Sequence, residues 1–254
     1  MEYTFFENFH IWRDAVAVLV ISGIALSFAG VWISFKKAVF LPLVISSFSS
    51  LGVVVSFLVA DLFEINSSPY IFSLIFAIAI SFYFANQKFG ALKGPVAVYL
   101  ISTSLIFIAG SFIRADIHDI DSILFGSAVL AEVKDVALAF AGAALMFTIF
   151  ALFYKKFLFV SFDPESAPAF GIRSYVYDVL MYAAFAVVIS ISSRAAGAFP
   201  VFGLTIFPAL TGLNLGKNMI SVFIISAIAA TVSAFLGYYI SFVFELPTGA
   251  SVVA

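Results

Sequence analysis

The chain has 254 residues, of which 64% are hydrophobic and only 10% are charged, and its formal net charge is −2. Ordinary soluble domains carry about 25% charged residues, so this composition excludes a soluble globular protein and indicates an integral membrane protein. The chain contains no cysteine, which excludes an internal disulfide framework or thiolate metal site.

Apolar runs long enough to cross a bilayer follow one another along the chain, since about 20 helical residues span the hydrocarbon core. A run such as Ala15 to Ile21 lacks the alternating polar residues of a barrel strand. We therefore predict an all-α bundle of about eight transmembrane helices in one domain over residues 1–254, with a short or broken seventh helix. The expected helices cover residues 14–35, 38–60, 69–86, 94–113, 135–154, 175–197, 199–213 and 219–244.

Basic residues gather in alternate loops between these helices, and cytoplasmic loops carry such an excess. They are Lys36, Lys37, Lys88, Lys93, Lys155, Lys156, Arg173 and Lys217. The remaining loops are mainly acidic. We therefore expect both termini outside the cytoplasm, and the longest polar interruption, residues 161–174, inside.

The second expected helix carries a stripe of small polar residues, including Ser46, Ser47, Ser49 and Ser50. Such a stripe can line a hydrophilic path. Serine hydroxyls also bond back to their own helix or across to a neighbour, and we favour this packing interpretation.

Residues 197–212 contain Pro200 and Pro208, so a straight helix is not expected there. A broken helix can flank a substrate path, and a packing kink is the alternative. The preceding Arg194 should reach the outer interface or a partner acid. Asp178 is a functional candidate because it lies within an expected helix, although pairing with nearby Arg173 at the interface, or snorkelling toward it, is the simpler interpretation.

The last expected helix repeats small residues every four positions, at Ala229, Ser233, Gly237 and Ser241. This spacing lets helix backbones approach closely in lipid. The partner is either another helix of this chain or a second copy.

Searches for catalytic motifs find nothing that supports an enzyme. The stretch 212–218 resembles a phosphate loop but has one residue too few between its glycines and no Ser or Thr after Lys217. Weak metal-ligand candidates lie in one acidic loop, where a solvated loop is the alternative. They are Asp116, His118, Asp119 and Asp121.

Two motifs carry a family resemblance. Residues 162–171, FDPESAPAFG, are similar to an FD-x-E-x-A-x-x-x-G segment, and the ending from Glu245, ELPTGA, is similar to a (D/E)LPTGA terminus. The chain thereby resembles the permease subunits of bacterial ABC importers for zinc, manganese and iron.

The resemblance implies a permease of the plasma membrane that transports a divalent metal and pairs with a second permease chain, identical or different. An extracytoplasmic metal-binding protein would deliver the cargo, and cytoplasmic ATPase subunits would hold ATP. No covalently bound cofactor and no nucleic acid is implied. Residues 161–174 would form a coupling helix that begins at Asp163 or Pro164. The residues implied to contact the ATPase are Phe162, Asp163, Pro164, Glu165, Ala167 and Gly171.

One departure from the family concerns the metal. Many members carry an Asp-x-x-x-His pair on the second helix, where this chain has Leu43 and Ser47, and neither is a good zinc ligand. A partner chain could supply ligands, the binding protein could do all the selecting, or the cargo could differ. An ion-coupled carrier or channel without an ATPase, and a degenerate subunit that transports nothing, are the competing functions.

Overall fold

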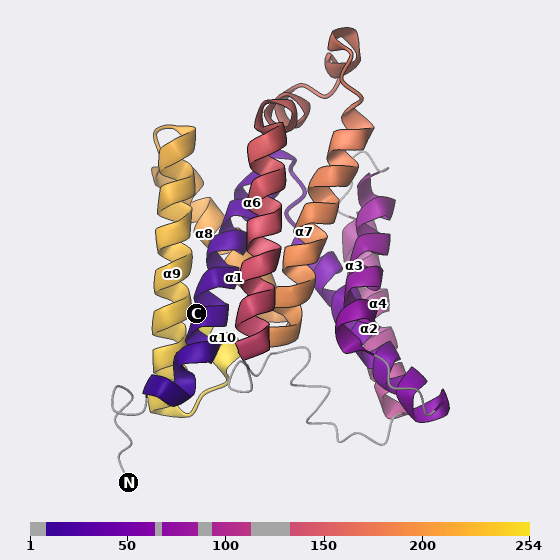
Figure 1. Cartoon of the computed structure of the whole chain (residues 1–254), viewed down its shortest axis with the longest axis vertical. Coiled ribbons are helices and arrows are strands. Elements are labelled where there is room, and N and C mark those ends of the chain that lie inside the picture. Colours follow the sequence, from indigo (N-terminus) through magenta and orange to yellow (C-terminus); the bar gives the residue numbers. More distant parts are fainter. Residues whose placement is uncertain (1–8, 64–67, 86–92, 113–132) are drawn as a thin grey trace.

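The computed structural model of the chain describes residues 9–63, 68–85, 93–112 and 133–254 (Figure 1). All regular structure within these ranges is helical. The long helices are α1 (Phe9–Phe35), α2 (Leu41–Phe63), α3 (Pro69–Ala85), α4 (Lys93–Ser111), α6 (Val133–Phe162), α7 (Ser174–Ala196), α8 (Ala198–Leu215) and α9 (Met219–Phe244). Two short helices are the 3-10 helix η2 (Ala167–Phe170) and α10 (Thr248–Val253).

The long helices match the apolar runs of the sequence, which confirms the prediction of an all-α membrane bundle. In the described part, seven helices are long and apolar enough to cross a membrane, and α3 is a shorter apolar helix of 17 residues. The seventh helix of the bundle, α8, is short but continues through Pro208. The chain breaks instead at Gly197, whose φ of 91° favours glycine and separates α7 from α8.

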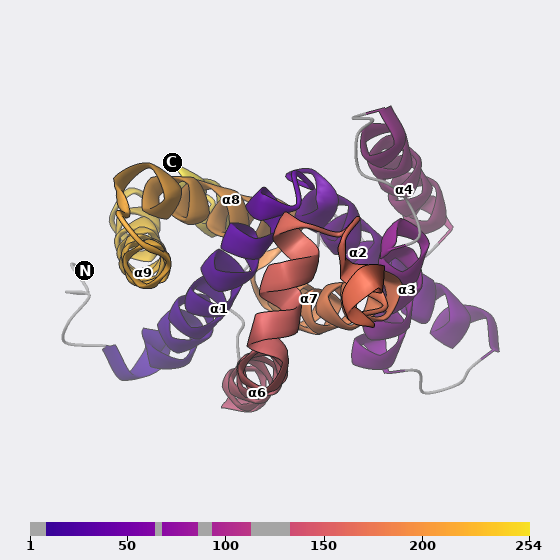
Figure 2. The ribbon, with the colours of Figure 1, turned by 90° about the horizontal axis from the view of Figure 1, so that it is seen from above.

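Helix α1 lies in the middle of the bundle (Figures 1 and 2). It contacts α6 and α7 as well as α8 and α9. Its Trp32 ring packs on Phe150 of α6 at 5.3 Å between centroids, and Phe150 stacks on Phe185 of α7 at 5.5 Å. Outward side chains such as Ile224 and Ile228 are exposed, as expected for a surface that meets membrane lipid.

The C-terminal helix α10 packs against α8 and α9, an element that the apolar runs did not predict. Helices α9 and α10 approach closely at Gly237 of α9, where a Cβ would lie 2.7 Å from the Ser251 carbonyl oxygen. Val252 of α10 is 3% exposed. The last residues of the chain are therefore part of the packed bundle.

The predicted packing face of α9 is correct near the C-terminal end of the helix. Along the rest of α9, other residues are buried. Gly237 and Ser241 are buried, and Ser241 Oγ bonds to the Leu246 carbonyl oxygen beside α10, so their partner is a helix of this chain. Ala229 and Ser233 are only half-buried. The buried face there passes through Val222, Ser226, Ala230 and Ala234.

Candidate functional site

Residues 161–174 project from one end of the bundle as a compact connection between α6 and α7 (Figure 1). The carboxylate of Asp163 accepts a hydrogen bond from the Ser166 backbone N–H at 3.1 Å, which closes a turn before η2 begins. Gly171 ends η2 in the left-handed conformation (φ 70°), and its N–H donates to the Pro168 carbonyl oxygen at 3.0 Å. The predicted end at Gly171 is confirmed, but the helix starts at Ala167 because Asp163 caps the preceding turn.

This segment offers an exposed surface with a buried anchor. Ala167 is fully buried, whereas Phe162 and Phe170 are 61% and 71% exposed. Pro164 and Glu165 are also exposed. The segment is therefore held to the bundle while its aromatic and acidic side chains remain available for contact.

The serine stripe of α2 is buried, and two of its four named hydroxyls bond to their own helix. Ser46 Oγ donates to the Leu43 carbonyl oxygen at 3.0 Å, and Ser47 Oγ donates to that of Val44 at 2.9 Å. Ser50 Oγ is buried and has no hydrogen-bond partner within the described ranges. The hydroxyls that bond back to the backbone fit the packing interpretation.

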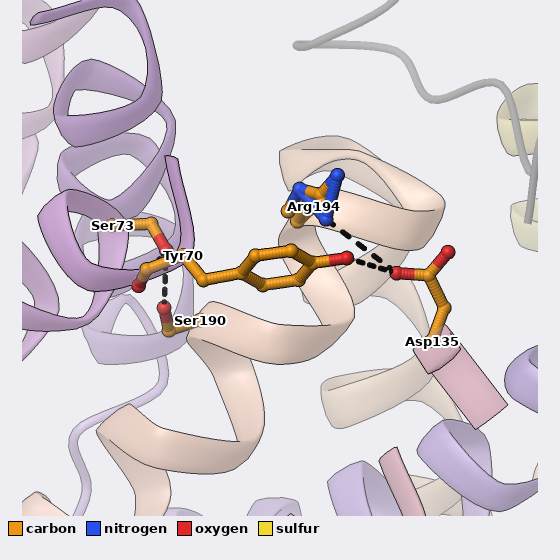
Figure 3. A network of polar contacts seen from close by, with 5 residues as sticks. All are labelled: Tyr70, Ser73, Asp135, Ser190 and Arg194. Carbon is orange, nitrogen blue, oxygen red and sulfur yellow. Dashed lines mark hydrogen bonds and ion pairs between the residues drawn. The ribbon is translucent and has the colours of Figure 1, made fainter. Parts of the chain in front are cut away.

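Other hydroxyls join α2 to its neighbours. Ser190 Oγ of α7 lies 3.3 Å from Ser49 Oγ and 3.0 Å from Ser73 Oγ of α3 (Figure 3 shows the second contact). Ser102 of α4 donates to Ser47 at 2.7 Å. Sequence analysis did not single out the three partner serines, because nothing in the local sequence distinguishes them from the other hydroxyl side chains of the same helices.

A polar network joins α3, α6 and α7 at the bundle end opposite residues 161–174 (Figures 1 and 3). Tyr70 Oη donates to Asp135 Oδ1 at 2.6 Å, and Arg194 Nη1 lies 3.5 Å from the same oxygen. The Arg194 guanidinium also lies 3.5 Å from the centroid of the Tyr70 ring. Arg194 thus has a partner acid, one of the two alternatives predicted for it, together with a cation–π contact.

We expect Tyr70→Phe to lower the stability of the bundle by about 1.5–3 kcal/mol, since it removes a hydrogen bond to a charged group but keeps the ring under Arg194. Arg194→Ala should lower the stability of the bundle further, because it also removes the cation–π contact. Thermal unfolding of the purified protein in detergent measures both. Tyr83→Phe, at a half-exposed position of α3, is the matched control and should leave the midpoint unchanged.

Asp178 of α7 pairs with Lys36, and not with Arg173 as predicted. Lys36 Nζ lies 2.7 Å from Asp178 Oδ1. Five residues along a helix place side chains about 140° apart, and Arg173 is the exposed N-cap residue of α7. The lysine reaches Asp178 from the end of α1, which the spacing within one helix does not reveal.

The predicted metal ligands Asp116, His118, Asp119 and Asp121 lie outside the described residues. Within the described ranges, no group of three His, Cys, Asp or Glu side chains is placed to hold a metal ion. Leu43 is half-buried on α2 and Pro208 is buried in α8. Around the serines of α2, the described residues thus offer hydroxyl oxygens rather than a cluster of strong metal ligands.

Comparison with known proteins matches residues 8–254 to the ABC 3 transport family. The manganese transport system membrane protein MntC of Listeria monocytogenes is 28% identical over all of this chain and 87% of its own length. The manganese import system permease protein ScaB of Streptococcus gordonii is 24% identical over 97% of this chain and 88% of its own length.

The fold is similar to a chain in the solved structure of PsaBC from Streptococcus pneumoniae in complex with Fab. The TM-score is 0.81 at 22% identity, over 98% of this chain and 89% of that one. The relatives are named as membrane and permease proteins of transport systems, which confirms the prediction of a transport subunit rather than an enzyme. The match over nearly its whole length identifies the chain as a member of the ABC 3 transport family.

Proposed function

We propose that this chain is the membrane-spanning permease subunit of an ABC importer that carries a divalent metal ion, with manganese as the first cargo to test. The observation that carries the proposal is an exposed, capped segment, residues 161–174, on a multi-pass bundle of the ABC 3 transport family. Such a bundle needs an outside source of energy, and the segment is the surface through which a separate ATPase would supply it.

The position of the segment supports a cytoplasmic ATPase contact. Lys155, Lys156 and Arg173 lie at the same bundle end, in the last part of α6 and at the start of α7. Cytoplasmic loops are enriched in such residues. Phe162, Asp163, Pro164, Glu165, Ala167 and Gly171 remain the proposed contact or positioning residues of this surface. The ends of α1 and α9 at Phe9 and Phe244 would then lie on the extracytoplasmic side.

The buried hydroxyls support a path that begins near the Arg194 network. Ser190 lies one helical turn before Arg194, and Ser73 lies one turn after Tyr70. Ser190 contacts both Ser73 and Ser49, and the contact with Ser49 continues the line of polar atoms toward the middle of α2. Ser46, Ser47 and Ser50 extend it as proposed path residues on the same helix.

Pro208 would contribute to the proposed path through the backbone of α8 rather than through its own ring. Proline has no backbone N–H, so the Leu204 carbonyl oxygen lacks its usual helical donor. Oxygen ligands suit manganese better than they suit zinc. With leucine and serine at positions 43 and 47, we assign selection of the metal to the binding protein or to a second permease chain, identical or different.

The test is metal uptake by vesicles that contain this chain, the ATPase that copurifies with it and the extracytoplasmic binding protein. We expect manganese to accumulate only when both the binding protein and hydrolysable ATP are present, as measured by elemental analysis of the washed vesicles. A non-hydrolysable ATP analogue is the control. Competition by zinc and by iron determines the cargo.

Two outcomes would contradict this assignment. Accumulation by the purified chain alone, driven by an ion gradient, would identify an ion-coupled carrier. No flux of any of the three metals with all partners present and ATP hydrolysed would identify a subunit that does not transport them.

A further inference from the structure

A mostly buried charge pair lies where the projecting segment meets the bundle. Lys36 Nζ contacts Asp178 Oδ1 at 2.7 Å and donates a hydrogen bond to the Val160 carbonyl oxygen at 2.8 Å. The side chains of Lys36 and Asp178 are only 10% and 19% exposed. One ammonium group therefore connects the end of α1 to the last turn of α6 and the second turn of α7, the two helices that flank residues 161–174.

The end of α1 directs Lys36 toward this position. The N–H of Ala38 bonds to the Ile33 carbonyl oxygen at 3.0 Å, and Lys37 takes a left-handed φ of 56°, which closes the helix with a tight turn. Lys37 is exposed whereas Lys36 is not. Val160 is among the last four residues of α6, whose carbonyl oxygens have no partner within the helix, and Lys36 supplies one.

Aromatic contacts strengthen the same connection. The Phe35 ring of α1 lies 5.1 Å from the Phe162 ring at the end of α6. On the segment itself, Phe170 packs on Phe159 of α6 at 5.3 Å. A displacement of the segment would therefore reach both the end of α6 and the end of α1.

Helix α1 is in turn packed closely against α8 and α9. A Cβ on Gly30 would overlap the Thr205 carbonyl oxygen of α8, whereas one on Gly23 would be in ordinary van der Waals contact with α9, 3.5 Å from the Ala230 carbonyl oxygen. The contact with α8 is between backbones and contains no flexible side chain that could absorb a shift. Motion of α1 along its axis must carry its neighbours or break these contacts.

We propose that Lys36 and Asp178 are positioning residues that transmit displacement of residues 161–174 to α1, and through α1 to α8 and α9. The inference rests on the proposed function, because it assumes that an ATPase moves the segment. A buried ion pair is costly compared with apolar side chains of similar size. The ion pair at this junction is explained if α1 must be held in a fixed orientation relative to α6 and α7.

The test compares coupling in the reconstituted complex, expressed as manganese imported per ATP hydrolysed. In the double variant Lys36→Met/Asp178→Leu both charges are gone, which leaves no unpaired buried charge and should preserve folding. We expect its manganese-to-ATP ratio to fall about tenfold while ATP hydrolysis continues, since loss of a coupling contact changes linkage rather than catalysis. The reversed pair Lys36→Asp/Asp178→Lys should recover part of the ratio.

A second readout does not depend on the cargo. Because the chain has no cysteine, Arg13→Cys places a single thiol at an exposed position on the far end of α1. A fluorophore there should respond to ATP in the complex with the intact pair and lose that response in the double variant. Lys37→Met, which removes the neighbouring exposed charge, is the matched control and should change neither readout.

The outcomes separate this inference from the proposed function. A folded double variant that keeps the normal metal-to-ATP ratio and the normal fluorophore response would overturn the inference. If the complex imports no metal but the ATP response is still lost in the double variant, the connection stands and the cargo assignment is wrong. A chain that binds no ATPase would overturn both.

Discussion

Phe170→Ser is expected to release the ATPase from this chain and to abolish most ATP-driven uptake. The ring is 71% exposed on η2, on the segment that projects beyond the bundle. Truncation of an aromatic anchor at a protein interface costs at least about 2 kcal/mol, which corresponds to roughly 30-fold weaker binding. Copurification of the ATPase from detergent extracts, followed by uptake in vesicles, measures both effects.

The matched control for this substitution is Phe112→Ser. Phe112 follows α4 and is 73% exposed, but it lies at the opposite end of the bundle. Both variants therefore lose an exposed aromatic ring, but only Phe170→Ser changes the proposed ATPase surface. Equal loss of copurification in both variants, or full retention with Phe170→Ser, would contradict the assignment of residues 161–174 as the ATPase contact.

The transmembrane helices were predictable because each is a long apolar run between charged residues. The expected helix over 175–197 matches α7 within one residue at each end. The expected end at residue 154 was too early for α6, which continues to Phe162. Lys155 and Lys156 do not end the helix, since a long side chain can carry its charge away from the apolar surface, and the Lys156 ammonium lies 5.1 Å from the Tyr177 ring centroid.

The contacts that define the candidate site were less predictable, because they join residues far apart in the chain. Asp178 and Arg173 are near neighbours in sequence, yet the acid pairs with Lys36, which comes from another helix. Arg194 was expected to reach the outer interface or a partner acid, but nothing in its local sequence distinguished Asp135 from other acids of the same face. Periodicity determines which face of a helix is buried, whereas tertiary packing determines which helix covers it.

The close approach of α1 and α8 predicts a large effect of a small substitution. Gly30→Ala would place its Cβ on the Thr205 carbonyl oxygen, a backbone atom that cannot rotate away. Alanine stabilises a helix by about 1 kcal/mol relative to glycine. Overpacking of a rigid contact lowers stability by up to about 3 kcal/mol, and occasionally by more. We therefore expect the free energy of unfolding to fall by about 2 kcal/mol or more, which lowers the thermal midpoint by roughly 4–8 °C.

Gly94→Ala separates this packing effect from helix propensity. Gly94 is also helical, in the first turn of α4, and a Cβ there would meet nothing within 4 Å. The same methyl group should therefore leave the midpoint unchanged or raise it slightly, by the propensity gain alone. If Gly30→Ala behaved like Gly94→Ala, α1 and α8 would not be in direct backbone contact. Motion of α1 could then be absorbed before it reached α8, and the transmission proposed for Lys36 and Asp178 would not extend to α8.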